Sequence, residues 1–245
     1  MKNYISIKDI DNLNSWIEEA KEIKLNPLKN IELGKNKTIG LLFFNSSLRT
    51  RLSTQKAALN LGMNPIVMNV SGDAWGIEFG DGTIMDGNTA EHIKEAAAVV
   101  SQYCDVIAVR AFPTLTDKEK DESEHVLKSF VQFASVPIVS MESATGHPLQ
   151  GLTDAITISE NTAKKKPKVV LSWAPHIKAL PHAVANSFTQ VMQKMDVEFV
   201  IANPEGYNLS SEITRDTPIF HTQKEAFKDA DFVYTKNWSS YNDYG

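Results

Sequence analysis

The sequence predicts an α/β fold with two doubly wound parallel sheets, one in each half of the chain. Short continuous apolar runs alternate with segments of helical periodicity, as is typical of strands buried on both faces between crossover helices. This alternation runs through the first half and starts again near residue 147. Because no Gly/Ser-rich linker separates the halves, we expect two packed domains, 1–147 and 148–245, with the active site in the cleft between them.

The first half opens with an amphipathic helix, since apolar residues recur at helical spacing from Ile10 to Ile23. Strands and helices then alternate with right-handed crossovers. Gly62 lies just past one predicted helix, where a left-handed cap is favoured. The expected strands are 38–44, 65–70, 105–110 and 136–141, and the expected helices are 50–61, 90–103 and 122–134.

The second half repeats the pattern over a shorter length. A helix over 150–163 is expected to bridge the halves. The chain stops soon after the last predicted strand, so we expect the second domain to be truncated. The expected strands are 168–173, 197–201, 219–221 and 231–235, with helices at 181–195 and 222–228.

Composition narrows the class of protein. The 245 residues include 25 Lys and Arg against 30 Asp and Glu, and this mild acidity argues against a nucleic-acid or anionic-membrane surface. No run is apolar enough to span a membrane and no signal peptide is recognisable. We expect the single cysteine, Cys104, to be a small buried residue. A chain with one cysteine fits a reducing compartment, so we expect a cytoplasmic protein. The histidines lack metal-ligand spacing, so we expect no metal site.

Polar residues follow most of the predicted strands. Ligands of open α/β sheets bind beyond the carboxyl ends of the strands, so these residues are candidates for one site. A dehydrogenase or kinase on a similar sheet is a weak alternative, because neither glycine-rich nucleotide motif follows a strand. The segments are Asn45–Arg51, Arg110, Glu142 with His147–Gln150, Trp173–His176 and Lys236–Trp238.

The segment from Ser47 to Arg51 favours phosphate binding. A helix N-terminus offers unpaired N–H groups and a positive dipole end, and hydroxyls at Ser47 and Thr50 add donors. Arg49 can bind phosphate oxygens with both ends of its guanidinium. The alternative is that Ser47 only caps the helix and the arginines form surface ion pairs. Arg51 cannot share the helix face of Arg49 and is expected to hold the loop through a carboxylate.

His147 and Gln150 follow the fourth predicted strand at the start of a helix. In that position we expect them to donate hydrogen bonds to a ligand oxygen. Pro148 at the first helical position stiffens the turn that holds them. The alternative is that both are ordinary polar residues packed at a helix start.

These segments resemble motifs of the aspartate/ornithine transcarbamylase superfamily. Ser47–Arg51 is similar to its S-x-R-T-R carbamoyl-phosphate loop, and His147–Gln150 is similar to its H-P-x-Q motif, with Arg110 at the strand end between them. The flanking residues Phe43–Ser46 and Trp173–His176 resemble the N-acetylornithine and N-succinylornithine carbamoyltransferases more than the ornithine or aspartate enzymes. The likeness runs along the whole chain.

The resemblance implies transfer of a carbamoyl group from carbamoyl phosphate to the side-chain amine of an N-acylated ornithine, in arginine biosynthesis. It also implies a homotrimer with shared active sites and no cofactor. The domain 1–147 would bind carbamoyl phosphate and 148–245 the acylated ornithine. The implied carbamoyl-phosphate ligands are Ser47, Leu48 through its backbone, Arg49, Thr50, Arg110, His147 and Gln150.

The same resemblance assigns roles. Arg49 and Thr50 would stabilise the leaving phosphate, while Arg110 and His147 polarise the carbonyl oxygen. Trp75 would reach the ligand from the neighbouring subunit, unless it is simply a buried loop aromatic. The residues that would contact the acylated amino acid are Glu142, His176 and Lys236, although Lys236 also suits a solvated strand end.

Ala90 bears on which acyl group is accepted. In acetyl-specific members of the family a glutamate stands at the similar position. A glutamate would repel the distal carboxylate of a succinyl group, whereas alanine leaves room for it. We therefore expect N-succinyl-L-ornithine as substrate, with N-acetylornithine as the alternative. Ala90 also fits an ordinary helix start.

The chain departs from the family pattern at its end. The family carries a later H-C-L-P motif, an arginine pair and a closing helix, none of which occurs in these residues. The alternative function is therefore a truncated, non-catalytic remnant that binds carbamoyl phosphate. Binding of that ligand without turnover would favour this alternative.

Overall fold

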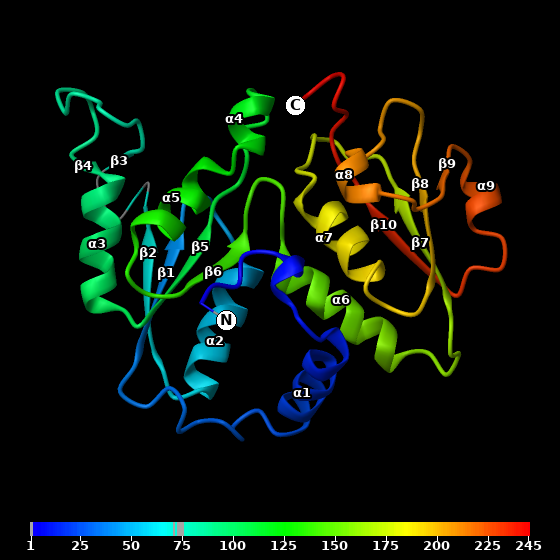
Figure 1. The fold of residues 1–245 in the computed structure, drawn as a ribbon, viewed down its shortest axis with the longest axis horizontal. Helices are drawn as coiled ribbons and strands as arrows, with labels where there is room; N and C mark the ends of the chain where they lie inside the picture. Colours follow the sequence, from blue (N-terminus) through cyan, green and yellow to red (C-terminus); the bar gives the residue numbers. More distant parts are fainter. Residues whose placement is uncertain (1, 71, 73–75) are drawn as a thin grey trace. The chain divides into compact units, whose positions relative to one another are not determined.

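The computed structural model describes residues 2–70, 72 and 76–245, and the chain divides into two compact units (Figure 1). The first unit holds the opening strand-rich half, and the second holds the later half. Segments 6–20 and 113–122, which the sequence places in the first domain, group with the second unit. The first unit is Met1–Ile5, Lys21–Phe112 and Ser123–Ser143, and the second is Ser6–Ala20, Pro113–Glu122 and Ala144–Gly245.

The first unit is built on a four-stranded parallel sheet in the order β2-β1-β5-β6. The chain passes from β1 to β2 on one side and then returns to β5 on the other, so its direction across the sheet reverses between β1 and β5. Right-handed crossovers place α2 on one face and α3 on the opposite face. The doubly wound arrangement is confirmed. The elements are β1 (Thr38–Phe43), α2 (Arg49–Asn60), β2 (Asn64–Asn69), α3 (Ile93–Tyr103), β5 (Val106–Arg110), α5 (His125–Phe133) and β6 (Ile138–Glu142).

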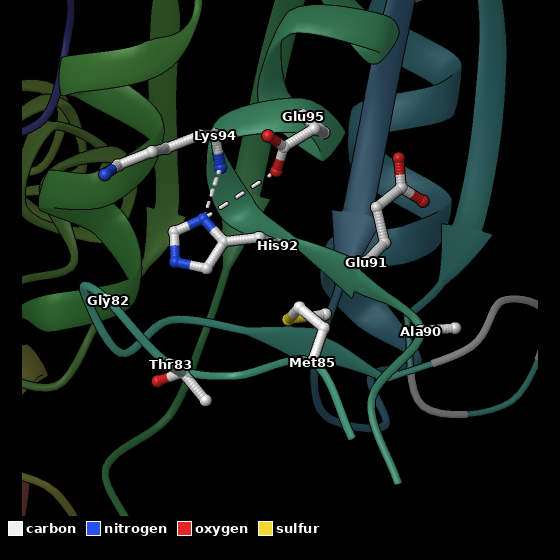
Figure 2. A pocket seen from close by; sticks show the side chains of 8 residues that line it. All are labelled: Gly82, Thr83, Met85, Ala90, Glu91, His92, Lys94 and Glu95. Atoms are coloured by element: carbon white, nitrogen blue, oxygen red, sulfur yellow. Dashed lines mark hydrogen bonds and ion pairs between the residues drawn. The ribbon is translucent and has the colours of Figure 1, made fainter. Parts of the chain in front are cut away.

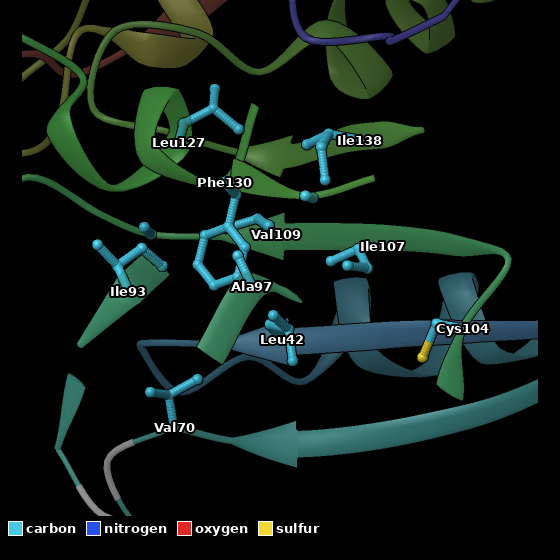
Figure 3. Packing of buried hydrophobic residues seen from close by; sticks show 12 residues of the cluster. Leu42, Val70, Ile93, Ala97, Cys104, Ile107, Val109, Leu127, Phe130 and Ile138 are labelled. Atoms are coloured by element: carbon cyan, nitrogen blue, oxygen red, sulfur yellow. The ribbon is translucent and has the colours of Figure 1, made fainter. Parts of the chain in front are cut away.

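The core of the first unit lies between this sheet and the helices α3 and α5 (Figure 3). Phe130 of α5 is fully buried among side chains of β1 and β5. Cys104 is buried as expected, and burial raises the pKa of its thiol. A Cβ at Gly40 would lie 2.9 Å from the Cys104 Sγ, so only glycine leaves room for that sulfur.

Local differences from the expected elements lie near residue 90. A pair of two-residue strands, β3 (Ile77–Glu78) and β4 (Glu91–His92), precedes α3, which starts three residues later than expected. His92 ends β4 and caps α3, because its Nδ1 accepts the Lys94 N–H at 3.2 Å. Ala90 is therefore not a helix-start residue. The left-handed cap at Gly62 is confirmed, with φ at 80°.

The second unit contains a parallel sheet in the order β10-β7-β8-β9. Here the direction reverses between β7 and β10, so this sheet is also doubly wound. Val170, Phe188 and Trp238 are fully buried in this unit. The elements are η1 (Ile7–Asp9), α1 (Leu13–Leu25), α4 (Lys118–Glu122), α6 (Pro148–Glu160), β7 (Lys168–Trp173), α7 (Ala183–Met192), β8 (Glu198–Ala202), α8 (Ser211–Thr214), β9 (Ile219–Phe220), α9 (Gln223–Ala226) and β10 (Phe232–Lys236). The boundary between the units falls inside α1, whose residues up to Ala20 belong to the second unit.

Within the second unit, the residues after β10 contact His182 at the start of α7 and Asp121 of α4. The His182 ring stacks on Tyr241 with centroids 4.2 Å apart, and its Nε2 donates to the Ser239 carbonyl at 2.8 Å. The Tyr244 hydroxyl donates to Asp121 at 3.0 Å. The ring of His182 is thus enclosed by aromatic and backbone groups.

Candidate functional site

The residues that follow β1, β5 and β6 lie at one edge of the first sheet, because the carboxyl ends of parallel strands share an edge. The edge between β1 and β5 is also the point at which the strand order reverses. In open α/β sheets this is the usual place for a ligand. The sequence-predicted Ser47–Arg51 segment and Arg110 both fall there.

The Arg110 side chain connects the loop after β1 to the end of β6 at this edge. Its Nη1 donates to the Ser46 carbonyl at 2.9 Å and to the Asn45 carbonyl at 3.3 Å, and its Nη2 pairs with Glu142 Oε2 at 3.2 Å. Burial lowers the pKa of the Arg110 guanidinium, and the Glu142 carboxylate opposes that shift. Within the described residues no group accepts from its buried Nε–H. A cationic donor is thereby held against the loop after β1.

No side chain in the described part of the chain caps the N-terminus of α2. Leu48 occupies the N-cap position and makes no capping hydrogen bond, so Ser47 does not cap the helix. Among the residues that the structure describes, none forms a hydrogen bond or ion pair with the Arg49 side chain, which is exposed. The first-turn N–H groups and the guanidinium are thus available to an anion.

Arg51 corrects the expectation of a carboxylate partner. Its Nη2 donates to the side-chain oxygen of Asn69, at the end of β2, and its guanidinium carbon lies 4.4 Å from the centre of the Phe43 ring. Arg51 therefore holds α2 against β2 through an amide and an aromatic ring, and no acid among the residues that the structure describes pairs with it.

His147 and Gln150 begin α6 in the second unit, with Pro148 at the first helical position as expected. The His147 Nδ1 accepts the Gln150 backbone N–H at 3.4 Å, so the proton of the neutral ring resides on Nε2. The Gln150 amide Nε2 donates to Asp154 Oδ1 at 2.8 Å. Gln150 thus already uses a donor, which the sequence did not predict, although Asp154 lies one helical turn away.

The second sheet has its own polar edge where β7 and β10 end. A pocket of about 210 Å³ opens there, with His176 and Trp173 in its wall. Trp173 Nε1 donates to the Trp238 carbonyl at 2.9 Å, and its ring lies 4.8 Å from that of Tyr207. The structure thus brings His176 to this edge. Lys236 ends β10 but is not part of the pocket wall, and no sequence signal pointed to Tyr207.

A larger pocket of about 590 Å³ in the first unit is lined by β4, the loop before it and the start of α3 (Figure 2). Ala90 lies on one side of it, and His92, Lys94 and Glu95 line the other. The His92 Nε2 donates to the Gly80 carbonyl at 2.9 Å, which holds β4 to the loop that connects β3 and β4. Ala90 is exposed to this pocket and adds no charge to it. Trp75 lies outside the described residues.

No three His, Cys, Asp or Glu side chains in the described part of the chain lie together in a way that would hold a metal ion. None of the helices described is both long and apolar enough to cross a bilayer.

Comparison with known proteins identifies a family to which this chain is similar. Residues 2–160 match the family model described as aspartate/ornithine carbamoyltransferase, carbamoyl-P binding domain. The N-succinylornithine carbamoyltransferase of Bacteroides thetaiotaomicron is 48% identical over 241 residues, which is 98% of this chain and 76% of that protein. The N-acetylornithine carbamoyltransferase of Xanthomonas campestris pv. campestris is 37% identical, over 98% of this chain and 75% of that protein.

A solved structure is similar over 100% of this chain and 78% of its own length, with a TM-score of 0.93 and 36% identity. It is a glutamate-to-serine mutant of N-acetyl-L-ornithine transcarbamylase, complexed with carbamyl phosphate and N-succinyl-L-norvaline.

Proposed function

The chain belongs to the aspartate/ornithine carbamoyltransferase family, and from this premise we propose that it carbamoylates the side-chain amine of N-succinyl-L-ornithine. Carbamoyl phosphate is the donor, and the products are N-succinylcitrulline and phosphate. This is a step of arginine biosynthesis. The observation that carries the proposal is the start of α2, where no described residue caps the helix or pairs with the Arg49 side chain, at the point where the first sheet reverses its strand order.

The phosphate group suits the start of α2. Its negative charge is stabilised by the helix N–H groups, the hydroxyls of Ser47 and Thr50, and the guanidinium of Arg49. Leu48 contributes only its backbone, which agrees with its exposed side chain. These groups stabilise the leaving phosphate more as its charge grows, which is the condition for catalysis.

The carbamoyl group needs donors for its oxygen and an acceptor for its NH2. Arg110 and the Nε2–H of His147 polarise the C=O bond, and the Gln150 side-chain oxygen accepts from the NH2. The amine lone pair of the ornithine attacks the carbonyl carbon, and the bond to the phosphate oxygen breaks as the C–N bond forms. The proton released by the amine passes to the departing phosphate.

The acylated ornithine is assigned to Glu142, His176 and Lys236. The pocket beside His176 supports this assignment, because it lies where the second sheet reverses its strand order. Lys236 offers a cation for a substrate carboxylate. Glu142 also forms an ion pair with Arg110, so one carboxylate would contact both the acylated ornithine and the arginine that binds carbamoyl phosphate.

The test is a direct assay of carbamoyl transfer. The purified chain is mixed with carbamoyl phosphate and N-succinyl-L-ornithine, and the carbamoylated product and released phosphate are measured together. Equal amounts of the two support the proposal. Binding of carbamoyl phosphate with no product supports the alternative of a non-catalytic carbamoyl-phosphate-binding protein.

Ala90→Glu is expected to shift preference from N-succinyl- toward N-acetylornithine, by about tenfold or more in relative kcat/KM. The new carboxylate would repel the distal carboxylate of the succinyl group and leave the acetyl group unaffected. Support comes from the related mutant in which a replaced glutamate accompanies an N-succinyl ligand. Competition between the two substrates measures the ratio, with Ala90→Gln as the uncharged control. An unchanged ratio would reject the role of Ala90.

The resemblance to the family also leads us to propose a cytoplasmic homotrimer in which Trp75 of one subunit completes the site of its neighbour. Light scattering during gel filtration should give three times the mass of one chain. Mixing an inactive Arg49→Ala chain with an inactive Trp75→Ala chain should restore activity, because some sites would receive both native residues. Monomeric mass would reject this assembly.

A further inference from the structure

Asp154 is a buried acid on α6, one turn beyond Gln150 (α6 is labelled in Figure 1). Only 8% of its surface is exposed, and its Oδ1 accepts from Gln150 Nε2 at 2.8 Å. Within the described residues its Oδ2 is buried and no group donates to it. Burial raises the pKa of Asp154 to about 6, and the Gln150 amide and the Tyr234 hydroxyl on β10, a titratable group that faces the acid, oppose that shift.

This arrangement is unfavourable for folding. A carboxylate that loses water without gaining a cation destabilises the folded chain, and the unpaired Oδ2 adds to the cost. A neutral amide of the same shape would avoid most of that cost. The value of an acid at position 154 therefore lies in what it does to its hydrogen-bonded partner, Gln150.

A carboxylate decides which end of a neighbouring amide faces it. Because an ionised acid only accepts hydrogen bonds, Asp154 holds the Gln150 NH2 group toward itself. The Gln150 oxygen then lies on the opposite side of the amide. An asparagine at 154 could donate as well as accept, so the Gln150 amide could turn over and present its NH2 outward.

We propose that Asp154 is a positioning residue that makes this site prefer a carbamoyl group to an acetyl group on the phosphate. The inference rests on the proposed function, in which the Gln150 oxygen binds the carbamoyl NH2. An acetyl group places a methyl where the NH2 would be. The held oxygen then stays unpaired, which penalises acetyl phosphate.

The test compares these two ligands in Asp154→Asn. Carbamoyl phosphate is varied as substrate, and acetyl phosphate is used as a competitive inhibitor. We expect the KM for carbamoyl phosphate to rise about tenfold, as the loss of one oriented hydrogen bond requires, while the inhibition constant of acetyl phosphate changes less than about twofold. The urea midpoint at pH 7 should stay the same or rise, since a buried charge is removed.

Two further variants separate positioning from general structure. In a Gln150→Ala background, Asp154→Asn should have no additional effect on the KM, because the residue through which it acts is gone. Glu160→Gln makes the same acid-to-amide change at the exposed end of α6 and should leave both constants unchanged. Asp154→Ala should raise the KM for carbamoyl phosphate as selectively as Asp154→Asn does. It replaces the asparagine variant in the test if that variant does not fold.

The outcomes are distinct. Equal weakening of carbamoyl phosphate and acetyl phosphate, or an unchanged KM for carbamoyl phosphate in a well-folded variant, overturns the role of Asp154 and leaves the proposed function standing. Absence of carbamoyl transfer by the unsubstituted chain rejects the proposed function, and the inference falls with it.

Discussion

Arg49→Ala is expected to weaken carbamoyl-phosphate binding about a hundredfold, since a bidentate pair of charge-assisted hydrogen bonds contributes about 3 kcal/mol. The guanidinium is exposed at the start of α2 and makes no bond with the described residues, so the substitution removes ligand contacts and not packing. Titration calorimetry with carbamoyl phosphate, and separately with inorganic phosphate, measures the loss.

The control for this prediction is Lys56→Ala. Lys56 is an exposed cation on the same helix, and its removal changes the net charge by the same amount. The affinity of the Lys56→Ala chain for phosphate should stay within about twofold of that of the unsubstituted chain, because exposed charges away from the ligand are screened. Equal losses in the two variants would mean that Arg49 acts only through net charge. Unchanged affinity of Arg49→Ala for carbamoyl phosphate would contradict the assignment of the phosphate site to the start of α2.

Acidification is expected to remove about 3 kcal/mol of unfolding free energy through His182 alone, since each pKa unit corresponds to about 1.4 kcal/mol. Burial lowers the pKa of His182 from 6.5 to about 4, the nearby Lys118 adds to the shift, and the bond to Ser239 opposes it. The unfolded chain takes up a proton near its ordinary pKa, whereas the folded chain resists until about pH 4. The contribution is therefore complete above the unfolded pKa and is lost as pH falls toward the folded value.

Asp154 titrates in an overlapping range with the opposite sign. Its pKa is raised to about 6 by burial, so protonation below that value favours the folded chain. Urea unfolding at a series of pH values should therefore compare the unsubstituted chain with His182→Gln. The difference in unfolding free energy should change by about 3 kcal/mol between pH 7 and pH 4. His221→Gln, at an exposed histidine of the second unit, is the control, and parallel curves for His182→Gln would contradict the prediction.

The positions of the candidate residues relative to each sheet were predictable from the sequence, whereas their partners were not. Continuous apolar runs locate the strands, and the polar residues after them must lie at the carboxyl edge. Which strands are neighbours is a property of the assembled sheet. Asn69 becomes the partner of Arg51 because β2 pairs with β1, and among the described residues this amide stands where an acid was expected.

Short elements and side-chain orientation escaped the sequence analysis for different reasons. Strands β3 and β4 have two residues each, which is too short for any periodicity, and they displaced the start of α3 from Ala90 to Ile93. The orientation of Gln150 depends on the burial of Asp154. Helical spacing brings these two residues together, but only the packed sheet shows that the acid is enclosed.

The strand order of the second sheet has a consequence for synthesis of the chain on the ribosome. Strand β7 is made first and pairs with β8 early, yet its other neighbour, β10, begins only at Phe232. Until that residue has been translated, β7, whose central residues are apolar and buried, has one unsatisfied edge. Such an edge recruits foreign strands, so the nascent protein is most open to aggregation, and most dependent on chaperones, during this interval.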